Sequence, residues 1–186
     1  MPESLVFCVG GTVSTTSGIP DCATATSGSI TFNQLFSPTD TATSFSQMAA
    51  STNAGSGYSI TISGPTLTSG ANTISALGAA SAGIRGVSQF GLNLKANTTS
   101  TSTVAVGNEV NPAANGTNLR GQAIAPYNSV DSFKFTDGDS IANSANGGAG
   151  GTDAQIFTVS YIVIVPGSQT AGTYTTTLTY VCTPTY

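Results

Sequence analysis

The chain has 186 residues, enough for one domain with a hydrophobic core. Only 6% of the residues are charged, against about 25% in an ordinary globular protein, and 30 threonines and 24 serines supply most of the polarity. The four basic residues are far apart in the sequence: Arg85, Lys95, Arg120 and Lys134. With a net charge of −4, this distribution excludes a basic patch for nucleic acid or for an anionic membrane surface. Histidine is absent, which removes Ser–His and Cys–His nucleophilic pairs and the usual zinc ligands.

Alternating apolar residues predict a series of strands along the chain. The first segment, "SLVFCVG", places Leu5, Phe7 and Val9 on one face. Further strands are predicted, in chain order, at residues 29–36, 46–52, 58–64, 89–97, 102–107 and 131–138. Helix is expected to be scarce, because glycines interrupt the only candidate segment, residues 72–86.

The last two predicted strands carry the clearest patterns. Residues 155–165, "QIFTVSYIVIV", end with apolar side chains on both faces, which predicts a central strand. From residue 173 to residue 182, Tyr174, Leu178, Tyr180 and Cys182 alternate with threonines, which predicts a half-buried strand with a threonine-coated outer face. The turn-forming segment "PGSQTAG" between the two predicts an antiparallel hairpin.

These patterns together predict an all-β fold. We expect a single antiparallel β-sandwich or jelly roll of about nine strands that spans residues 1–186 as one domain. Long Gly/Asn-rich loops are predicted at residues 107–131 and 137–153. No run of about 18 apolar residues is present, so we expect no membrane insertion.

The three cysteines predict one local disulfide. Cys8 and Cys22 bracket a loop rich in Gly, Ser and Thr, and closing a loop of this length would stabilise the fold by about 3 kcal/mol. Cys182 is then unpaired, either as a small buried side chain on the core face of the last strand or as a thiol that pairs with another subunit. Its pairing with Cys8 or Cys22, in place of the local disulfide, is a further alternative.

Acidic residues offer one weak metal site. Asp137, Asp139 and Asp153 flank the Gly/Asn-rich loop, and their carboxylates are candidate Ca²⁺ ligands. The segment lacks the acidic positions of an EF-hand loop, so solvated turn residues are the favoured interpretation. We expect no metal, no cofactor and no enzymatic activity, because no pair of acids or nucleophile with a base is evident.

Three further residues are candidate modification or ligand sites. Asn97 in "NTT" and Asn115 in "NGT" are glycosylation sequons. Tyr127, which follows Pro126 in a predicted loop, is the tyrosine best placed to be exposed and to stack on a sugar.

Four segments carry a resemblance to a known family: "SLVFCVGGT", "SQMAASTNAGSGYSITISGPTLTSGANTI", "SQFGLNLKANT" and "FTVSYIVIVPGSQTAGTYTTTLTY". They cover most of the chain and resemble secreted surface proteins of the ultrasmall candidate-phyla bacteria. The terminal "AGTYTTTLTY" is also similar to the last strands of spore-coat-U-like and pilin-type extracellular subunits. The resemblance implies a cell-surface β-sandwich without catalytic residues. It also implies that a native strand precedes the "ESLVFC" segment and is missing from this chain.

The sequence therefore favours a secreted, non-catalytic structural subunit of a surface filament or coat. We expect a homopolymer or homo-oligomer that assembles by pairing of strands or sheet edges, since the scarcity of charge suits close packing between copies. The alternative is an adhesin or carbohydrate-binding module that grips a surface glycan with its long loops.

Overall fold

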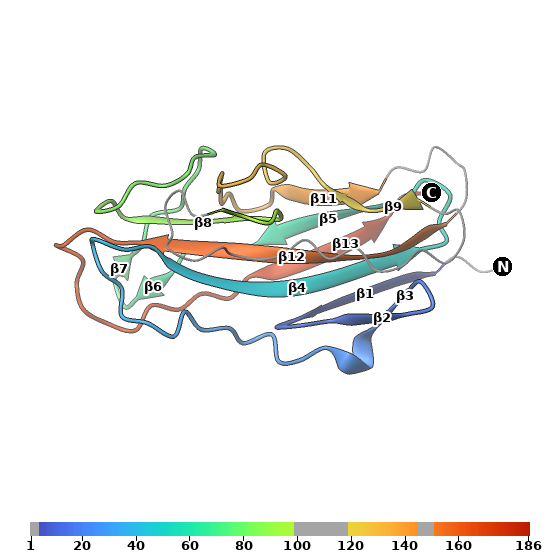
Figure 1. Ribbon diagram of the computed structural model, residues 1–186, viewed down its shortest axis with the longest axis horizontal. Helices are drawn as coiled ribbons and strands as arrows, with labels where there is room; N and C mark the ends of the chain where they lie inside the picture. The colour runs from blue at the N-terminus through green and yellow to red at the C-terminus, as the bar shows by residue number, and fades with distance from the viewer. Residues whose placement is uncertain (1–3, 99–118, 145–150) are drawn as a thin grey trace.

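A computed structural model describes residues 4–98, 119–144 and 151–186 of the chain. Thirteen strands lie in these residues, and a single 3₁₀ turn, η1 (Cys22–Thr24), is the helical element among them (Figure 1). The strands are β1 (Leu5–Gly10), β2 (Ser14–Thr16), β3 (Ile19–Asp21), β4 (Ala42–Thr52), β5 (Tyr58–Ser63), β6 (Thr68–Ser69), β7 (Asn72–Thr73), β8 (Gln89–Asn93), β9 (Leu119–Arg120), β10 (Gln122–Ala123), β11 (Ser140–Ser144), β12 (Thr152–Ile164) and β13 (Thr179–Pro184). The predicted all-β class is confirmed.

The longer strands form two sheets. Sheet I has the order β1-β4-β12-β8, with the short β9 also paired to β12, and sheet II has the order β10-β11-β5-β13. Both sheets contribute side chains to one hydrophobic core: Met48 and Val159 come from sheet I, and Ile60 and Ala142 from sheet II. The two remaining pairs, β2-β3 and β6-β7, are small hairpins outside these sheets.

Strand β12 is buried along its whole length, which confirms the central position predicted from its apolar sequence. It pairs antiparallel with β4 along one edge and with β8 along the other. Its inner face, which includes Tyr161, contributes to the main core. Its outer face is covered by two smaller clusters, one where Ile156 packs with Val13, and one where Ile162 packs with Phe133. Sheet I is therefore covered on both faces at β12.

The alternation predicted for β5 and for the last strand is confirmed. Tyr58, Ile60 and Ile62 are fully buried, and Tyr180 and Cys182 face the same core from β13. The predicted hairpin of the last two strands is wrong, however, because β13 pairs with β5 in sheet II and not with β12. Since β4 and β8 already occupy both edges of β12, the chain crosses to the open edge of β5.

Three further expectations differ from the structure. Residues 29–36 form no strand, although Ile30 and Phe32 pack against the main core. The predicted loop at 137–153 contains β11, which pairs with β5. The predicted strand at 131–138 is reduced to isolated bridges at Phe133 and Lys134. The predicted strand at 102–107 lies outside the described residues.

The buried alternation of β5 makes a testable prediction. Ile62→Ala should lower the free energy of unfolding by about 2–5 kcal/mol, because it opens a cavity in the core. Leu178→Ala is the matched control, since Leu178 is only partly buried and should cost less. Chemical denaturation measures both. Equal losses would contradict this description of the core.

Candidate functional site

The free edge of β1 is the strongest candidate for a functional surface. β1 stands at the end of sheet I and pairs antiparallel with β4, with Leu5 opposite Thr52. The Asn53 N–H donates to the Ser4 carbonyl in the pair that continues this register. Because hydrogen-bonded pairs alternate along an antiparallel ladder, the backbone groups of Leu5, Phe7 and Val9 point away from β4.

These outward groups have no backbone partner among the described residues. No hydrogen bond joins the N–H or C=O groups of Leu5, Phe7 or Val9 to another described backbone group. The strand itself, Leu5–Gly10, contains no charged residue and no proline. Natural sheet edges usually carry such residues to prevent pairing with other chains, so the edge of β1 is unprotected.

The edge of β13 provides an instructive contrast. The Thr185 N–H donates to the Gly57 carbonyl, so by the same alternation the backbone groups of Tyr180, Cys182 and Pro184 point away from β5. Proline has no N–H, so Pro184 removes a donor from this outward row. At the opposite edge of sheet I, the outward backbone groups of β8 form hydrogen bonds with neighbouring segments. The Leu92 N–H, for example, donates to the Lys134 carbonyl.

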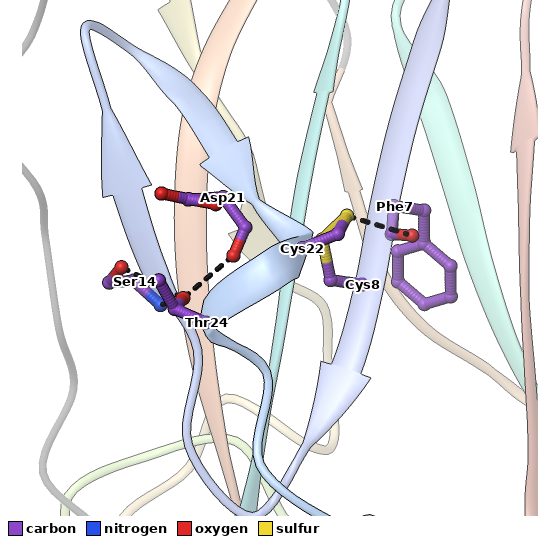
Figure 2. Close-up of a disulfide and its surroundings, with 6 residues drawn as sticks. All are labelled: Phe7, Cys8, Ser14, Asp21, Cys22 and Thr24. Atoms are coloured by element: carbon purple, nitrogen blue, oxygen red, sulfur yellow. Dashed lines mark hydrogen bonds between the residues drawn. A yellow bond between two sulfur atoms is a disulfide. The ribbon is translucent and has the colours of Figure 1, made fainter.

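A disulfide links β1 to η1 on the outer face of sheet I. The structure joins Cys8 and Cys22, whose Cα atoms are 5.3 Å apart, as their spacing predicts. Figure 2 shows Cys22 reaching from η1 to β1, where its Sγ lies 3.7 Å from the Phe7 carbonyl oxygen. Since a disulfide sulfur carries no proton, this approach is a contact and not a hydrogen bond.

Cys182 is the free cysteine and lies on the core side of β13. This placement matches the interpretation of a small side chain against the core. Burial raises the pKa of its thiol to about 12. An ordinary cysteine has a pKa near 8.5, so Cys182 is a poor nucleophile and a poor partner for an intermolecular disulfide.

The three aspartates of the weak calcium site do not come together. The Asp137 carboxylate accepts a hydrogen bond from the Gly64 N–H, and Asp139 forms an ion pair with Lys134. Asp153 is buried on β12, opposite Arg120 of β9. Within the described residues no group of three His, Cys, Asp or Glu side chains that could hold a metal ion is present, so the structure does not bring the three aspartates together as one site.

The structure places the side chain of the glycosylation candidate Asn97 inside the fold. Asn97 is 5% exposed, and its amide exchanges two hydrogen bonds with the amide of Asn93, at 2.6 and 2.8 Å. Its Oδ1 also accepts from the Asp131 N–H at 2.8 Å. A glycan on this nitrogen would break the network. Asn115 lies outside the described residues.

Tyr127 is not the exposed sugar platform that its loop position predicted. It is 1% exposed, and its hydroxyl donates to Asp139 at 2.7 Å. The Lys134 ammonium lies 5.7 Å from the ring centroid, within range of a cation–π interaction. Burial and the neighbouring Asp139 carboxylate raise the pKa of Tyr127 above its ordinary value. The charged residues Lys134 and Asp139, five positions apart, are the sequence feature that indicates polar partners for Tyr127.

A hollow of about 260 Å³ lies near the start of β1. Its walls come from the beginning of β1, the turn between β2 and β3, and the ends of β4 and β12, with Val6 and Asp153 among the lining residues. The lining combines hydroxyl groups, backbone and a single carboxylate, so it offers no obvious catalytic arrangement.

Comparison with protein-family models, with curated proteins and with solved structures finds no match for this chain. Within the described residues, no helix has the length and apolarity needed to cross a membrane.

The cysteine assignments can be tested by thiol titration. At about pH 8, Cys182 should react very slowly with a soluble thiol reagent in the native protein, because burial disfavours its thiolate. Unfolding without reductant should release one reactive thiol per chain, and Cys182→Ser should abolish that signal. Three thiols in the unfolded, unreduced wild type would contradict the disulfide.

Asn97→Ala should lower the free energy of unfolding by about 1–3 kcal/mol, because it removes both hydrogen bonds with the buried Asn93 amide and the acceptor of the Asp131 N–H. The exposed Asn72, whose amide makes one hydrogen bond to Ser69 in the β6–β7 hairpin, supplies the control Asn72→Ala. Thermal or chemical denaturation compares the two. If Asn97→Ala were as mild as the control, the amide pair would not stabilise the fold.

Proposed function

We propose that this protein is a non-catalytic, extracellular structural subunit of a surface filament or coat, and that its copies associate through the edge of β1. The observation that carries the proposal is the unprotected row of backbone groups at Leu5, Phe7 and Val9. An added strand from another copy would satisfy these donors and acceptors in the manner of β-strand addition.

The surface chemistry supports association between like copies. Val9 is 38% exposed on the edge strand, and Ile19 of β3 is 52% exposed. Few charged side chains would have to lose their hydration when two copies meet, because only 6% of the residues are charged. Shielding of the open edge and burial of these apolar side chains would then favour the associated state.

The disulfide supports an extracellular location. Disulfides form and persist in oxidising compartments and are rare in the cytosol. The Cys8–Cys22 bond, together with the resemblance of the sequence to secreted surface proteins, is the basis for proposing secretion.

The alternative, an adhesin or carbohydrate-binding module, receives less support. Its best aromatic candidate, Tyr127, is buried and hydrogen-bonded to Asp139. No other observation on the described surface singles out a glycan site.

The test is an edge-blocking variant. Val9→Pro removes an outward N–H that β4 does not use, and proline is compatible with an edge strand. The matched control is Val9→Thr, which keeps the N–H and the branched side chain. Sedimentation velocity over a range of concentrations should show that the wild type and Val9→Thr associate and that Val9→Pro stays monomeric, with similar melting temperatures for all three.

The size distribution also identifies the mode of pairing. Symmetric pairing of β1 with β1 would close as a dimer, whereas pairing of β1 with a different edge would propagate into a filament. A wild type that remains monomeric at high concentration, both with its disulfide intact and after reduction, would overturn the proposal and favour the binding module.

A further inference from the structure

Residues 29–36 have the sequence pattern of a strand but are not paired as one. The segment, "SITFNQLF", alternates Ile30 and Phe32 with polar residues and contains no charge and no proline. It forms no strand, and no backbone–backbone hydrogen bond involves it within the part of the chain that the structure describes. Asn33, with a φ of 50°, interrupts the extended backbone, and asparagine adopts this conformation more readily than most residues. The segment therefore combines strand composition with a row of backbone groups that no other segment pairs.

Apolar side chains hold the segment against the molecule. Ile30, Phe32 and Phe36 pack on the main core while remaining partly exposed, and the rings of Phe32 and Phe36 meet edge to face with centroids 5.6 Å apart. Leu35 makes a contrast, because 94% of its surface is exposed. An exposed leucine beside unpaired backbone groups is the combination that pairing with a further strand would bury.

The segment runs past the end of β1 and not along its free edge. The Ser27 carbonyl accepts from the Gly11 N–H at 3.0 Å, so the segment begins where β1 ends. The Thr31 carbonyl accepts from the Ser44 hydroxyl at 3.0 Å, and Ser44 lies beyond Gln47, the residue of β4 at which the pairing with β1 stops. Figure 1 accordingly shows the chain between η1 and β4 running along the margin of the molecule, away from the start of β1.

The chain is too short for the segment to pair with β1 of the same copy. Antiparallel pairing from the end of β1 would carry Phe36 beyond Leu5, which lies opposite Thr52 at the far end of β4. The six residues from Phe36 to Ala42 span at most about 21 Å. The ten residues of β4 from Ala42 to Thr52 span about 33 Å. An antiparallel pair of this segment with the β1 edge therefore needs two copies of the protein.

We propose that residues 29–36 of one copy form the strand that pairs with the β1 edge of another copy. The unpaired N–H and C=O groups of the segment then bond to the outward groups of Leu5, Phe7 and Val9, and Leu35 becomes buried at the contact. Neither strand carries a charge, so no ion loses its hydration when they meet. This inference rests on the proposed function, because it identifies the partner of the same edge.

The pairing has a consequence for the shape of the assembly. The two surfaces differ, so each copy in a pair still has one segment and one β1 edge available. Such a heterologous contact adds copies in one direction and gives a filament unless the rotation closes a ring. Symmetric pairing of β1 with β1 would instead end at a dimer.

The first test removes the exposed leucine. Leu35→Ser should raise the dissociation constant for self-association by about tenfold, because the burial of one leucine side chain is lost. Ile84→Ser is the matched control, since Ile84 is also an exposed branched side chain, at 62%, and lies in the loop before β8. Sedimentation velocity should show unchanged association for the control, and both variants should keep the wild-type melting temperature. Equal association of Leu35→Ser and Ile84→Ser would overturn the inference.

The second test asks whether the segment itself recognises the edge. The probe is a fluorescent peptide of residues 28–37, extended by two lysines for solubility, and the control peptide has the same composition in scrambled order. Fluorescence anisotropy should show saturable binding of the probe, but not of the control peptide, to the wild-type protein and to Val9→Thr. Val9→Pro should not bind it, because the outward N–H is missing. Binding that Val9→Pro retains, or no saturable binding to the wild type, would overturn the inference.

The combined results separate this inference from the proposed function. Association that Val9→Pro blocks, but that neither Leu35→Ser nor the unlabelled peptide weakens, overturns the inference and leaves the proposed function intact. A size distribution that stops at a dimer has the same meaning. Binding of the peptide at the β1 edge, with a full chain that stays monomeric at every concentration, supports the match of segment and edge and overturns the proposed function.

Discussion

The complete burial of β12 is the constraint on which the rest of the structure depends. This strand of thirteen residues pairs with β4 along one edge and with β8 and β9 at the two ends of the other, and it is buried along its whole length. In an arrangement of two sheets, the second sheet covers only the inner face of β12. Its outer face must therefore be covered by other segments of the chain. Here the β2–β3 hairpin covers one part of that side, through Val13 on Ile156, and Leu77 and Phe133 cover another. The burial of β12 therefore depends on these segments outside the two sheets.

The pairing of β12 also affects which strands lie at the edges of the two sheets. Because β4 and β8 flank the end of β12 from which the chain leaves, β13 pairs with β5 in sheet II, and β1 lies at the end of sheet I. Backbone bonds from irregular segments close the outward side of β8, and Pro184 weakens the outward row of β13. On β1, the outward backbone groups of Leu5, Phe7 and Val9 have no backbone partner among the described residues.

The many hydroxyl groups have different roles in the core and on the surface of the protein. Inside, the Ser46 hydroxyl, the Tyr161 hydroxyl and the Tyr180 hydroxyl form a chain that joins β4 and β12 to β13, and therefore links the two sheets. Burial raises the pKa of both tyrosines, so the chain stays neutral across the ordinary pH range. Outside, threonine and serine face each other across β5 and β13, as at Thr179 and Ser63. Short hydroxyls solvate this surface and suit the strand backbone without long charged side chains.

The sequence by itself determined the features that belong to a single strand or a short loop. The alternation of Tyr58, Ile60 and Ile62 places side chains on one face whatever the neighbours are, and the spacing of Cys8 and Cys22 allows a local disulfide. Only the tertiary structure decided which edges meet, and therefore that the last strand joins β5. It also decided that Tyr127 and Asn97 are buried, because Asp139 and the backbone of Asp131 approach them from later parts of the chain. The physical reason is that the face of a strand is a local property of the backbone, whereas strand partners and burial depend on which edges and surfaces elsewhere in the chain remain free.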